Sequence, residues 1–435
     1  MFHRLPIGLF VNHLWYYKFT MIRVVITGVG AVTPLGNTFQ DSWNAVKAGV
    51  SGVREVTKVS GSKMKWNSAG ELKQFSADAY LEQKELRRLD PFVHYAVSAA
   101  AMSAEDAGLI KANGRPCLDG YLPSGGVIFG SSRGGISTIE KALMNMRNND
   151  LNAQGYRLSS YLMPATTISM AASSVAQKLG IYGHCLGLSN ACASGSNAIG
   201  EAYRLLKAGF QGPVIAGGTD APICNLCMEG YGRSGALSKA GPHCASRPFD
   251  RQRDGFVLSE GACALVLENL GSALKRDAKI YGEVIGYSNT VDASHQTRPD
   301  IRGEIRAMRS ALDDAGVTQE GIDYISAHGT STQIGDYVES EAILAAFGEK
   351  APYIPVSAVK SMTGHMLGAS GAFETACTAM SLLEGVVPPT INIRERDSRC
   401  GINLITERSN LPIKTALSSS FGFGGMNAVL VLRKL

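Results

Sequence analysis

The sequence predicts an α/β fold made of two similar halves, and three observations support this prediction. Hydrophobic residues make up 45% and charged residues 18% of the 435 residues, which is typical of a folded protein with a large core. Apolar runs that end in Gly-, Ser- or Thr-rich loops alternate with segments of helical periodicity. Similar strand–loop–helix units occur on both sides of the charged stretch 269–279, so we expect halves at 21–271 and 272–435.

Each half has its own series of expected elements. In the first half, residues 90–108 have the apolar spacing of a helix that ends at Gly108. Three apolar runs there predict strands that lead into glycine loops, within residues 23–36, 125–135 and 213–221. In the second half, residues 303–315 predict a helix that stops at Gly316. A further strand is expected near the end of the first half, within residues 264–270. The strands expected in the second half lie within residues 281–289, 323–332, 352–365, 414–425 and 427–435.

Residues 1–20 do not fit this pattern, because the globular sequence begins just after Met21. Their apolar part is interrupted by His13, is too short to span a bilayer and has no small-residue cleavage site. We expect an N-terminal extension without order: a leader, a transit-like segment or the product of an upstream start codon. The expected location is the cytoplasm, or an organelle if the segment is a transit peptide.

Charge and cysteine content exclude several classes of protein. The net charge of +5 is mild for this length and no long Lys/Arg run is present, so no nucleic-acid partner is expected. The nine cysteines are odd in number and follow no convincing secretory signal, which indicates reduced thiols. Cys224 and Cys227 form a CxxC without a second ligand pair nearby, so we expect two buried thiols rather than a zinc site.

Cys192 is the first candidate for chemistry. It stands in "SNACASGSNAIGEAYRLLKAG" (189–209), at the edge of a predicted helix over 193–208 that ends at Gly209. The free N–H groups and the dipole at a helix start favour a thiolate. A small buried core residue is the alternative, and this motif alone does not decide between them.

Two histidines favour the catalytic interpretation. His328 follows a short strand in "SAHGTST", and His365 lies in the Gly-rich loop "KSMTGHMLGASG". Loops at strand ends are where α/β sheets build active sites. Lys360 opens the second of these loops, and Glu374 lies in the first turns of the helix that follows it.

A third loop, "SSSFGFGGMN", places Phe421 and Phe423 between glycines. One interpretation is a Gly-rich turn with packed aromatic rings. The other is a mobile loop that swings an aromatic ring over a cavity, with the glycines as hinges.

Taken together, these motifs resemble the β-ketoacyl-acyl carrier protein synthases, and most closely the elongating enzymes of bacterial and mitochondrial fatty-acid synthesis. The resemblance rests on the Cys192 helix start, "HGTST", "KSMTGHMLGASG" with Glu374, and "FGFGG". The segments "ASRPFDRQRDGFVLSEGA" (245–262) and "VPPTIN" (387–392) also fit. The resemblance extends from about Met21 to the C-terminus. It implies a thiolase fold of five layers, α-β-α-β-α, in a homodimer. The implied partner is an acyl carrier protein, with neither a membrane nor a metal or redox cofactor.

The resemblance also implies a reaction. Cys192 takes an acyl group from the carrier's phosphopantetheine, and a malonyl-carrier then loses carbon dioxide to give an enolate. The enolate attacks the acyl-Cys192 thioester and yields a 3-oxoacyl product. His328 and His365 would donate hydrogen bonds from Nε2 to the malonyl thioester oxygen, and the backbone N–H groups of Cys192 and Phe423 would form the oxyanion hole.

Other residues receive supporting roles from the same resemblance. Lys360 and Glu374 would fix the loop and the charge around His365. The pantetheine arm would be bound by the hydroxyls of Thr330 and Thr332, and by Thr297 in "HQTRP". Residues 82–90, "EQKELRRLD", place Lys84, Arg87 and Arg88 on one face of a helix, which is either an ordinary solvated face or a docking patch for an acidic carrier.

The sequence departs from the family pattern at three positions. Ser370 replaces the usual Ala of the Gly-rich motif, and Met426 replaces the common Thr after the double glycine; both look tolerable. Arg133, in "GSSRGG", stands where many fatty-acid elongating relatives have an apolar residue that lines the acyl pocket. It either pairs with an acid and shortens the pocket, or faces a polar or conjugated substrate, or points to solvent and only positions its loop.

Related activities remain as alternatives. A thiolase would carry a second catalytic Cys late in the chain, a starter-unit synthase would pair Cys with His and Asn, and a chain-length-determining subunit would lack the nucleophile. Residues Cys192, His328 and His365 match none of these. A ketosynthase of a specialised polyketide or polyene pathway stays open, because the motifs do not report acyl chain length or saturation.

Overall fold

The computed structural model describes residues 22–59, 65–111, 122–151 and 158–435. The extension expected over residues 1–20 lies outside these ranges. Within them, eleven strands form one continuous sheet in the order β13-β11-β10-β15-β16-β9-β1-β8-β6-β4-β5. The strands in that order are Asn403–Leu404, Pro355–Ser357, Tyr324–Ser326, Thr415–Gly422, Met426–Arg433, Gly282–Val291, Val24–Val32, Gly261–Asn269, Val214–Asp220, Gly126–Gly130 and Cys185–Leu188.

The sheet consists of two parts that are joined at one narrow place. Strands β1 and β9 pair over only three residues each, Val24–Ile26 with Gly282–Val284, whereas β1 and β8 pair along most of their length. One part therefore contains β1, β8, β6, β4 and β5, and the other contains β9, β16, β15, β10, β11 and β13.

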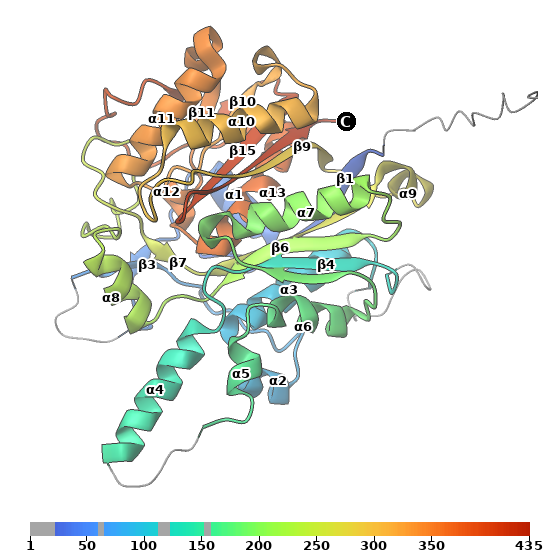
Figure 1. Cartoon of the computed structure of the whole chain (residues 1–435), viewed down its shortest axis with the longest axis vertical. Helices are drawn as coiled ribbons and strands as arrows, with labels where there is room; N and C mark the ends of the chain where they lie inside the picture. The colour runs from blue at the N-terminus through green and yellow to red at the C-terminus, as the bar shows by residue number, and fades with distance from the viewer. Residues whose placement is uncertain (1–21, 60–64, 112–121, 152–157) are drawn as a thin grey trace, which may run out of the picture.

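The long helices build five layers with these two sheet parts (Figure 1). Helices α3 (Pro91–Asp106) and α6 (Met170–Leu179) cover the outer face of the first part, and α10 (Ile301–Ala315) and α11 (Gln333–Phe347) lie on the outer side of the second. Helices α7 (Ser194–Lys207) and α13 (Ser370–Glu384) lie between the two parts. This arrangement confirms the predicted α-β-α-β-α architecture.

The expected helices form for the reasons visible in the sequence. The Asp90 carboxylate accepts a hydrogen bond from the Phe92 N–H and caps α3, with Pro91 at the first helical position. Asp300 caps α10 in the same way, and Gly316 ends it with φ of +62°, a left-handed conformation that favours glycine. Apolar residues then bury one face of each helix against the sheet.

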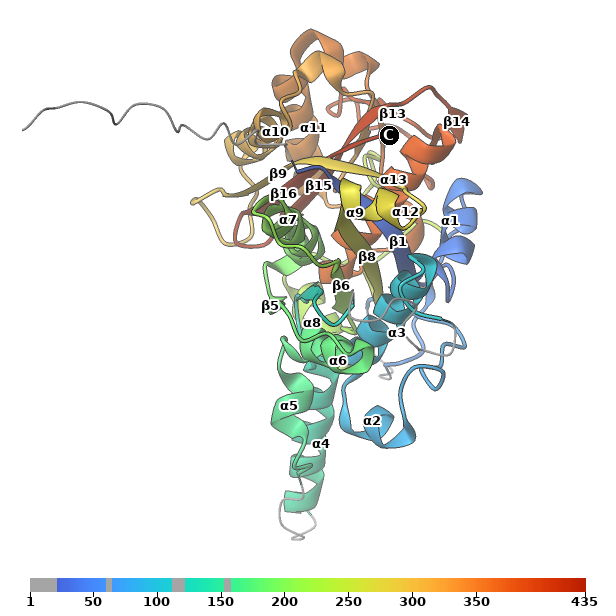
Figure 2. The ribbon, with the colours of Figure 1, turned by 90° about the vertical axis from the view of Figure 1, so that its right-hand side faces the viewer.

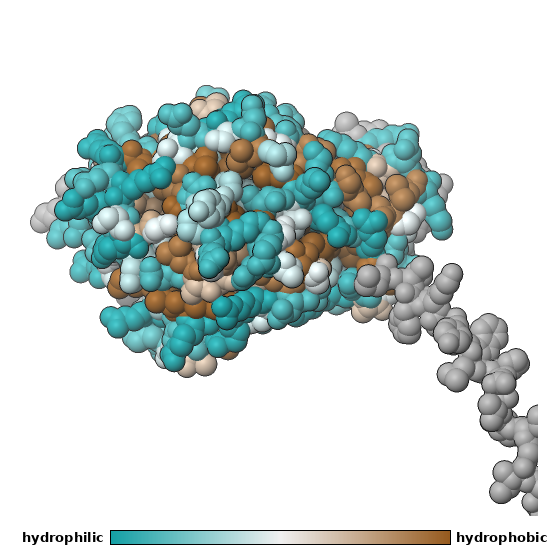
Figure 3. All heavy atoms as spheres, turned by 90° about the horizontal axis from the view of Figure 1, so that it is seen from above, coloured by the Kyte–Doolittle hydropathy of each residue, from teal (hydrophilic) through white to brown (hydrophobic). Residues whose placement is uncertain are grey.

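Seen from the side of α10 and α11, hydrophilic side chains cover much of the surface, with hydrophobic ones visible between them (Figure 3). At the opposite end, α4 (Ile136–Leu151) and α5 (Leu162–Thr166) project from the body, with α2 (Gln83–Arg88) nearby (Figure 2). Helices α4 and α5, like α6 and α11, were not predicted from the sequence. The remaining helices are α1 (Phe39–Lys47), α8 (Asn225–Arg233), α9 (Leu270–Lys275) and α12 (Lys360–Thr363).

Two small sheets accompany the main one: β2 (Arg54–Glu55), β3 (Ser68–Gly70) and β7 (Leu258–Ser259), and the pair β12 (Val386–Val387) and β14 (Ser409–Asn410). Over the described ranges, no helix combines the length and the apolar character needed to cross a membrane. The eight cysteines in those ranges are all free thiols, and Cys224 and Cys227 are buried, as predicted.

Candidate active site

Cys192 lies in a short 3₁₀ turn, Ala191–Ala193, directly before α7. Small residues around it allow a second loop to approach closely. A Cβ on Gly195 or Gly218 would lie only 2.5 or 2.1 Å from the Gly368 carbonyl oxygen, so only glycine fits at either position. Gly368 belongs to the loop that carries His365, and the glycines thus bring the thiol and the imidazole together.

His365 faces the nucleophile directly. Its Nε2 lies 2.9 Å from the Cys192 Sγ, and its Nδ1 lies 3.0 Å from the Ser370 Oγ. The backbone of His365 is held on both sides, because its N–H donates to the Val257 carbonyl and its carbonyl accepts from the Ser259 N–H. The ring is therefore fixed between Cys192 and the start of α13.

His328 is held by Lys360 and Glu339. The Lys360 Nζ lies 3.2 Å from the His328 Nδ1 and 2.7 Å from the His328 carbonyl oxygen, and it forms a 2.6 Å ion pair with Glu374. The Glu339 carboxylate accepts the backbone N–H groups of His328 and Gly329 at 2.6 and 2.7 Å. Because an ammonium group only donates, the His328 proton is expected on Nε2.

Burial dominates the electrostatics of the site. It raises the pKa of the Cys192 thiol to about 11, and the positive charges of Lys360 and Arg133 offset only part of this effect. Burial and the Lys360 charge hold the pKa of both His328 and His365 well below the usual value. Burial therefore opposes the thiolate expected at the helix start, and it favours the neutral form of both imidazoles.

The third loop forms the turn between β15 and β16. The Phe423 backbone N–H donates a hydrogen bond to the Cys192 sulfur, so this N–H points to the place expected for an oxyanion hole. The Phe421 ring is buried, and its centre lies 5.9 Å from the centre of the His328 ring. The Phe423 side chain, in contrast, is 36% exposed. Whether this turn moves stays a prediction.

A cavity of about 500 Å³ leads from the surface to the thiol. Most of the residues predicted to act on substrate line it: Cys192, His328, His365, Phe421, Phe423, Thr297, Thr330 and Thr332. Lys360 and Glu374 lie behind this wall, each no more than 2% exposed, as expected of residues that hold others in place.

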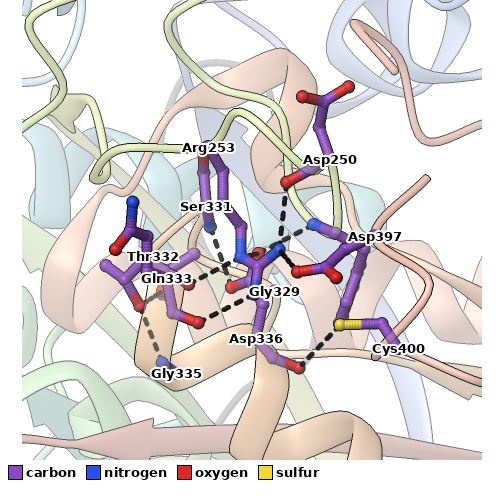
Figure 4. Close-up of polar contacts among 12 residues, drawn as sticks. Asp250, Arg253, Gly329, Ser331, Thr332, Gln333, Gly335, Asp336, Asp397 and Cys400 are labelled. Atoms are coloured by element: carbon purple, nitrogen blue, oxygen red, sulfur yellow. Dashed lines mark hydrogen bonds and ion pairs between the residues drawn. The ribbon is translucent and has the colours of Figure 1, made fainter. Parts of the chain in front are cut away.

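The loop with Thr330 and Thr332 is clamped by a fully buried arginine (Figure 4). Arg253 donates to the backbone carbonyls of Thr332 and Gln333 at 3.0 and 2.7 Å and forms ion pairs with Asp336 and Asp397. A buried charge is tolerated only with such partners. The hydroxyls of Thr330 and Thr332 lie 3.1 Å apart on the cavity wall.

Arg133 lies outside the cavity wall but touches a residue that forms it. Its Nε donates to the Tyr231 hydroxyl at 2.7 Å, and Tyr231 lines the cavity. Its backbone N–H donates to the buried Asp220 carboxylate, which also accepts from the Gly368 N–H and so links the Arg133 and His365 loops. The Arg133 side chain is exposed, and among the described residues no acid pairs with its guanidinium. The acid expected as its partner is therefore not found in the part of the chain that the structure describes.

Sequence reasoning missed four residues that the structure places in or behind the site: Asp220, Tyr231, Arg253 and Glu339. Asp220 stands at the end of an apolar strand, a position where a polar residue signals function. Arg253 lies within the segment 245–262, but its contacts reach distant parts of the chain. Glu339 lies beyond the "HGTST" motif, on α11. No local pattern indicates the role of Tyr231.

The basic side chains on α2 are exposed, and two of the three contact other side chains. Lys84 pairs with Glu82, and the Arg88 guanidinium lies 4.4 Å from the centre of the Tyr161 ring. In the part of the chain that the structure describes, Arg87 makes no ion pair, and all three side chains face solvent.

Cys192, His328 and His365 also offer the one metal-like donor set found among the described residues, with ligand atoms within 4.8 Å of one another. A thiol flanked by two neutral imidazoles, below an N–H-lined cavity, is more directly suited to acyl transfer than to metal storage. The five-layered fold and this triad together define a thiolase-like condensing enzyme.

The comparisons with known proteins name the family. The β-ketoacyl synthase N-terminal domain matches residues 21–273 and its C-terminal domain matches residues 281–394. The chain is 42% identical to 3-oxoacyl-[acyl-carrier-protein] synthase 2 of Synechocystis sp. over 95% of this chain and 98% of that protein. The enzyme of the same name from Staphylococcus aureus strain MRSA252 is 41% identical, with the same coverage. The chain belongs to the β-ketoacyl synthase family and is an acyltransferase-class condensing enzyme.

Solved structures agree with this result. The ishigamide ketosynthase/chain length factor superposes with a TM-score of 0.88 at 33% identity, covering 96% of this chain and all of that one. A β-ketoacyl synthase from Burkholderia phymatum STM815 superposes with a TM-score of 0.86 at 34% identity, covering 95% of this chain and all of that one. A type II polyketide ketosynthase in complex with its acyl-carrier protein also superposes with a TM-score of 0.86, at 32% identity, covering 96% of this chain and all of that one.

Proposed function

We propose that this enzyme is a 3-oxoacyl-[acyl carrier protein] synthase that elongates fatty acyl chains by decarboxylative Claisen condensation. In the first step, the Cys192 sulfur attacks the thioester of an acyl group on the carrier's phosphopantetheine. The acyl–sulfur bond to pantetheine breaks, and the departing sulfur takes up the proton that Cys192 loses. One thiol replaces another, so the exchange needs no net base. The Phe423 N–H beside the sulfur supports an oxyanion hole formed with the Cys192 N–H.

In the second step, a malonyl-carrier occupies the cavity and loses carbon dioxide. The electron pair of the broken carbon–carbon bond moves toward the thioester oxygen, where Nε2–H groups of His328 and His365 donate hydrogen bonds. The resulting enolate carbon attacks the acyl-Cys192 carbonyl and expels the cysteine sulfur. Neutral imidazoles suit this role, because burial keeps the pKa of both rings low and the proton on Nε2 stabilises developing charge.

The observation that carries this proposal is the meeting of Cys192, His365 and His328 at one end of the cavity. The three belong to loops from both halves of the fold, yet the Sγ and the His365 Nε2 are 2.9 Å apart. The threonines of the cavity wall are available for the amides and hydroxyl of pantetheine, which arrives on the carrier. No metal or redox cofactor enters these steps, because decarboxylation drives formation of the carbon–carbon bond.

A second candidate is a ketosynthase of a specialised pathway that takes short or polar acyl groups. The Arg133–Tyr231 hydrogen bond favours it, because a guanidinium fixes a wall of the cavity next to the nucleophile. Two of the solved structures with similar folds also favour it: the ishigamide ketosynthase/chain length factor and the type II polyketide ketosynthase.

Single substitutions test the roles with radiolabelled carriers. Cys192→Ala is expected to lose condensation by more than about a thousandfold and to bind no acyl label, yet to keep malonyl decarboxylation. His328→Ala is expected to lose decarboxylation by about a hundredfold or more and still to form labelled acyl-Cys192. Cys244→Ala is the control, because Cys244 does not line the cavity. Near-normal condensation by His328→Ala would contradict the proposed roles.

Three further expectations are proposed with this function. The chain divides into catalytic halves at 21–271 and 272–435, acts in the cytoplasm, and works as a homodimer. The narrow pairing of β1 with β9 supports the division into two halves. The free thiols of the eight described cysteines support the cytoplasmic location. Among the described strands, β5 pairs on one side only, and its open outer edge supports the homodimer.

A further inference from the structure

Ser370 places its hydroxyl against the imidazole that faces the nucleophile. Its Oγ lies 3.0 Å from Nδ1 of His365, while Nε2 of the same ring lies 2.9 Å from the Cys192 Sγ. Ser370 and His365 are 1% and 2% exposed, so water does not compete for either group. Ser370 is the first residue of α13, and its position relative to the ring is fixed by the helix.

The hydrogens of this pair can be arranged in two ways, because a neutral imidazole carries a single N–H. Either the serine O–H donates to Nδ1, which leaves the ring hydrogen on Nε2, or Nδ1–H donates to Oγ. The second arrangement requires another acceptor for the serine hydrogen. In the described part of the chain, Nδ1 is the sole hydrogen-bond partner of this hydroxyl. Burying a donor without an acceptor is unfavourable, so the first arrangement is preferred.

We propose that Ser370 is a positioning residue that holds His365 with its hydrogen on Nε2, directed at the reacting atoms beside Cys192. This inference rests on the proposed function, in which the His365 Nε2–H donates to the developing enolate. His328 has a parallel arrangement, since the Lys360 ammonium donates to its Nδ1. Two different donors, an ammonium and a hydroxyl, thus select the same tautomer on the two rings.

An Nε2–H group can stabilise a negative oxygen but cannot accept a proton from a thiol. The tautomer therefore matters for decarboxylation and condensation more than for attack by Cys192. Alanine at position 370 offers neither a donor nor an acceptor, so in Ser370→Ala the ring is free to place its hydrogen on Nδ1. We expect malonyl decarboxylation to fall about tenfold, whereas alkylation of Cys192 by iodoacetamide stays within about twofold of wild type.

The tautomer is read directly from the ¹⁵N spectrum of enzyme labelled on its eight histidines. The His365 signals are identified by their loss in a His365→Gln variant. We expect a protonated Nε2 and a hydrogen-bonded, unprotonated Nδ1 in the wild type, and a shift toward the Nδ1-protonated form in Ser370→Ala. Ser196→Ala is the matched control, because Ser196 is equally buried but pairs with Ser420 rather than with a histidine.

The wild-type spectrum tests the inference even if Ser370→Ala does not fold. A wild-type His365 protonated on Nδ1 would overturn it, and so would a folded Ser370→Ala enzyme with an unchanged His365 spectrum. The readout does not depend on catalysis. An enzyme with the expected tautomer but without decarboxylase activity would refute the proposed function and leave the assignment of Ser370 intact.

Discussion

Lys360 is the residue whose charge reaches every member of the catalytic group. It contacts His328 and Glu374 directly, and its positive charge lowers the pKa of the Cys192 thiol against the opposing effect of burial. The same charge holds the pKa of His328 and of His365 low. One buried ammonium thus favours both a more reactive sulfur and neutral imidazoles.

Replacing this charge should therefore slow the chemistry of the thiol. In Lys360→Met, the pKa of Cys192 is expected to rise above its value of about 11, because the thiolate loses its nearest stabilising charge. At pH 8 to 9, alkylation by iodoacetamide should then be about tenfold slower, and its pH profile should move upward. Lys207→Met, an exposed lysine on α7, is the control. An unchanged profile in Lys360→Met would remove the lysine from this role.

Arg133 and Tyr231 make a prediction about substrate range. The Arg133 guanidinium fixes the Tyr231 hydroxyl, and Tyr231 forms the cavity wall. If this pair closes the acyl pocket, the wild-type enzyme prefers short or polar acyl groups. Arg133→Ile should then extend the range to longer saturated chains, because it removes the hydrogen bond that fixes Tyr231 in the cavity wall.

The measurement is the product mass from a panel of acyl-carriers of increasing length. Tyr231→Phe is the matched variant, since it keeps the ring and removes only the hydroxyl that Arg133 binds; it is expected to widen the range less than Arg133→Ile. A wild-type enzyme that elongates long saturated chains as fast as short ones would show that Arg133 and Tyr231 do not close the acyl pocket. The enzyme would then be an ordinary fatty-acid synthase.

At the scale of single residues, the sequence predicted which residues lie together in the site. It did not predict the contacts that fix each side chain. The spacing of small residues and glycines around Cys192, His328 and His365 was enough to indicate a loop-built site. The contacts of Ser370 and Tyr231 could not be predicted, because each depends on side-chain positions between segments far apart in the chain. The opposing effect of burial on the pKa of the thiol could not be predicted, because the helix start is visible in the sequence and the depth of burial is not.

At the scale of elements, local signals predicted the regular core well. The caps of α3 and α10 and the glycine after α10 are readable in sequence because they act within one turn. The short strands β10 and β11 lie within the predicted segments 323–332 and 352–365. Helices α4 and α5, which project from the body, were not predicted, and neither were α6 and α11. The buried face of α11 includes Asp336 and Glu339, so its apolar stripe is interrupted.

Helix α2 carries the prediction about the carrier. Its basic side chains face solvent, and Arg87 is without an ion-pair partner among the described residues. Arg87→Glu with Arg88→Glu should raise the apparent KM for acyl-carrier several-fold at low salt and weaken its salt dependence, because an acidic carrier would meet like charge. Activity with a small pantetheine thioester should stay unchanged.

Lys275→Glu is the control for this experiment, since it reverses an exposed basic charge on α9. If the KM for the carrier at low salt is the same in the α2 variant as in the wild type, the docking patch lies elsewhere. Equal losses in the α2 and α9 variants would indicate an effect of net charge rather than a patch.

On the scale of the whole molecule, the two halves explain why catalytic residues so far apart in sequence meet. Helix α7 of the first half and α13 of the second share the middle layer, and each begins at a catalytic loop. The repeated strand–loop–helix pattern predicted two halves. It could not predict that their strands join in one sheet through β1 and β9, because strand order depends on pairing between distant segments.

The opposite end of the sheet leads to the last prediction, which concerns the oligomer. Strand β5 pairs with β4 alone among the described strands, and Leu186 on it is 39% exposed. Other apolar side chains in the segments around it are also exposed: Tyr182 at 86% and Met163 at 67%. An open edge with exposed apolar residues tends to pair with another chain. A second copy placed across this edge would cover them and lie near the Arg133 loop.

Light scattering after gel filtration should therefore give twice the chain mass of 46.1 kDa. Leu186→Asp with Met163→Asp should yield the single-chain mass, because each change places a charge at the proposed contact. Leu274→Asp, on α9, is the matched control, since this leucine is 63% exposed but lies away from the edge. A wild-type enzyme of single-chain mass that still condenses at full rate would show that the site is complete in one chain. The open edge of β5 would then need another partner.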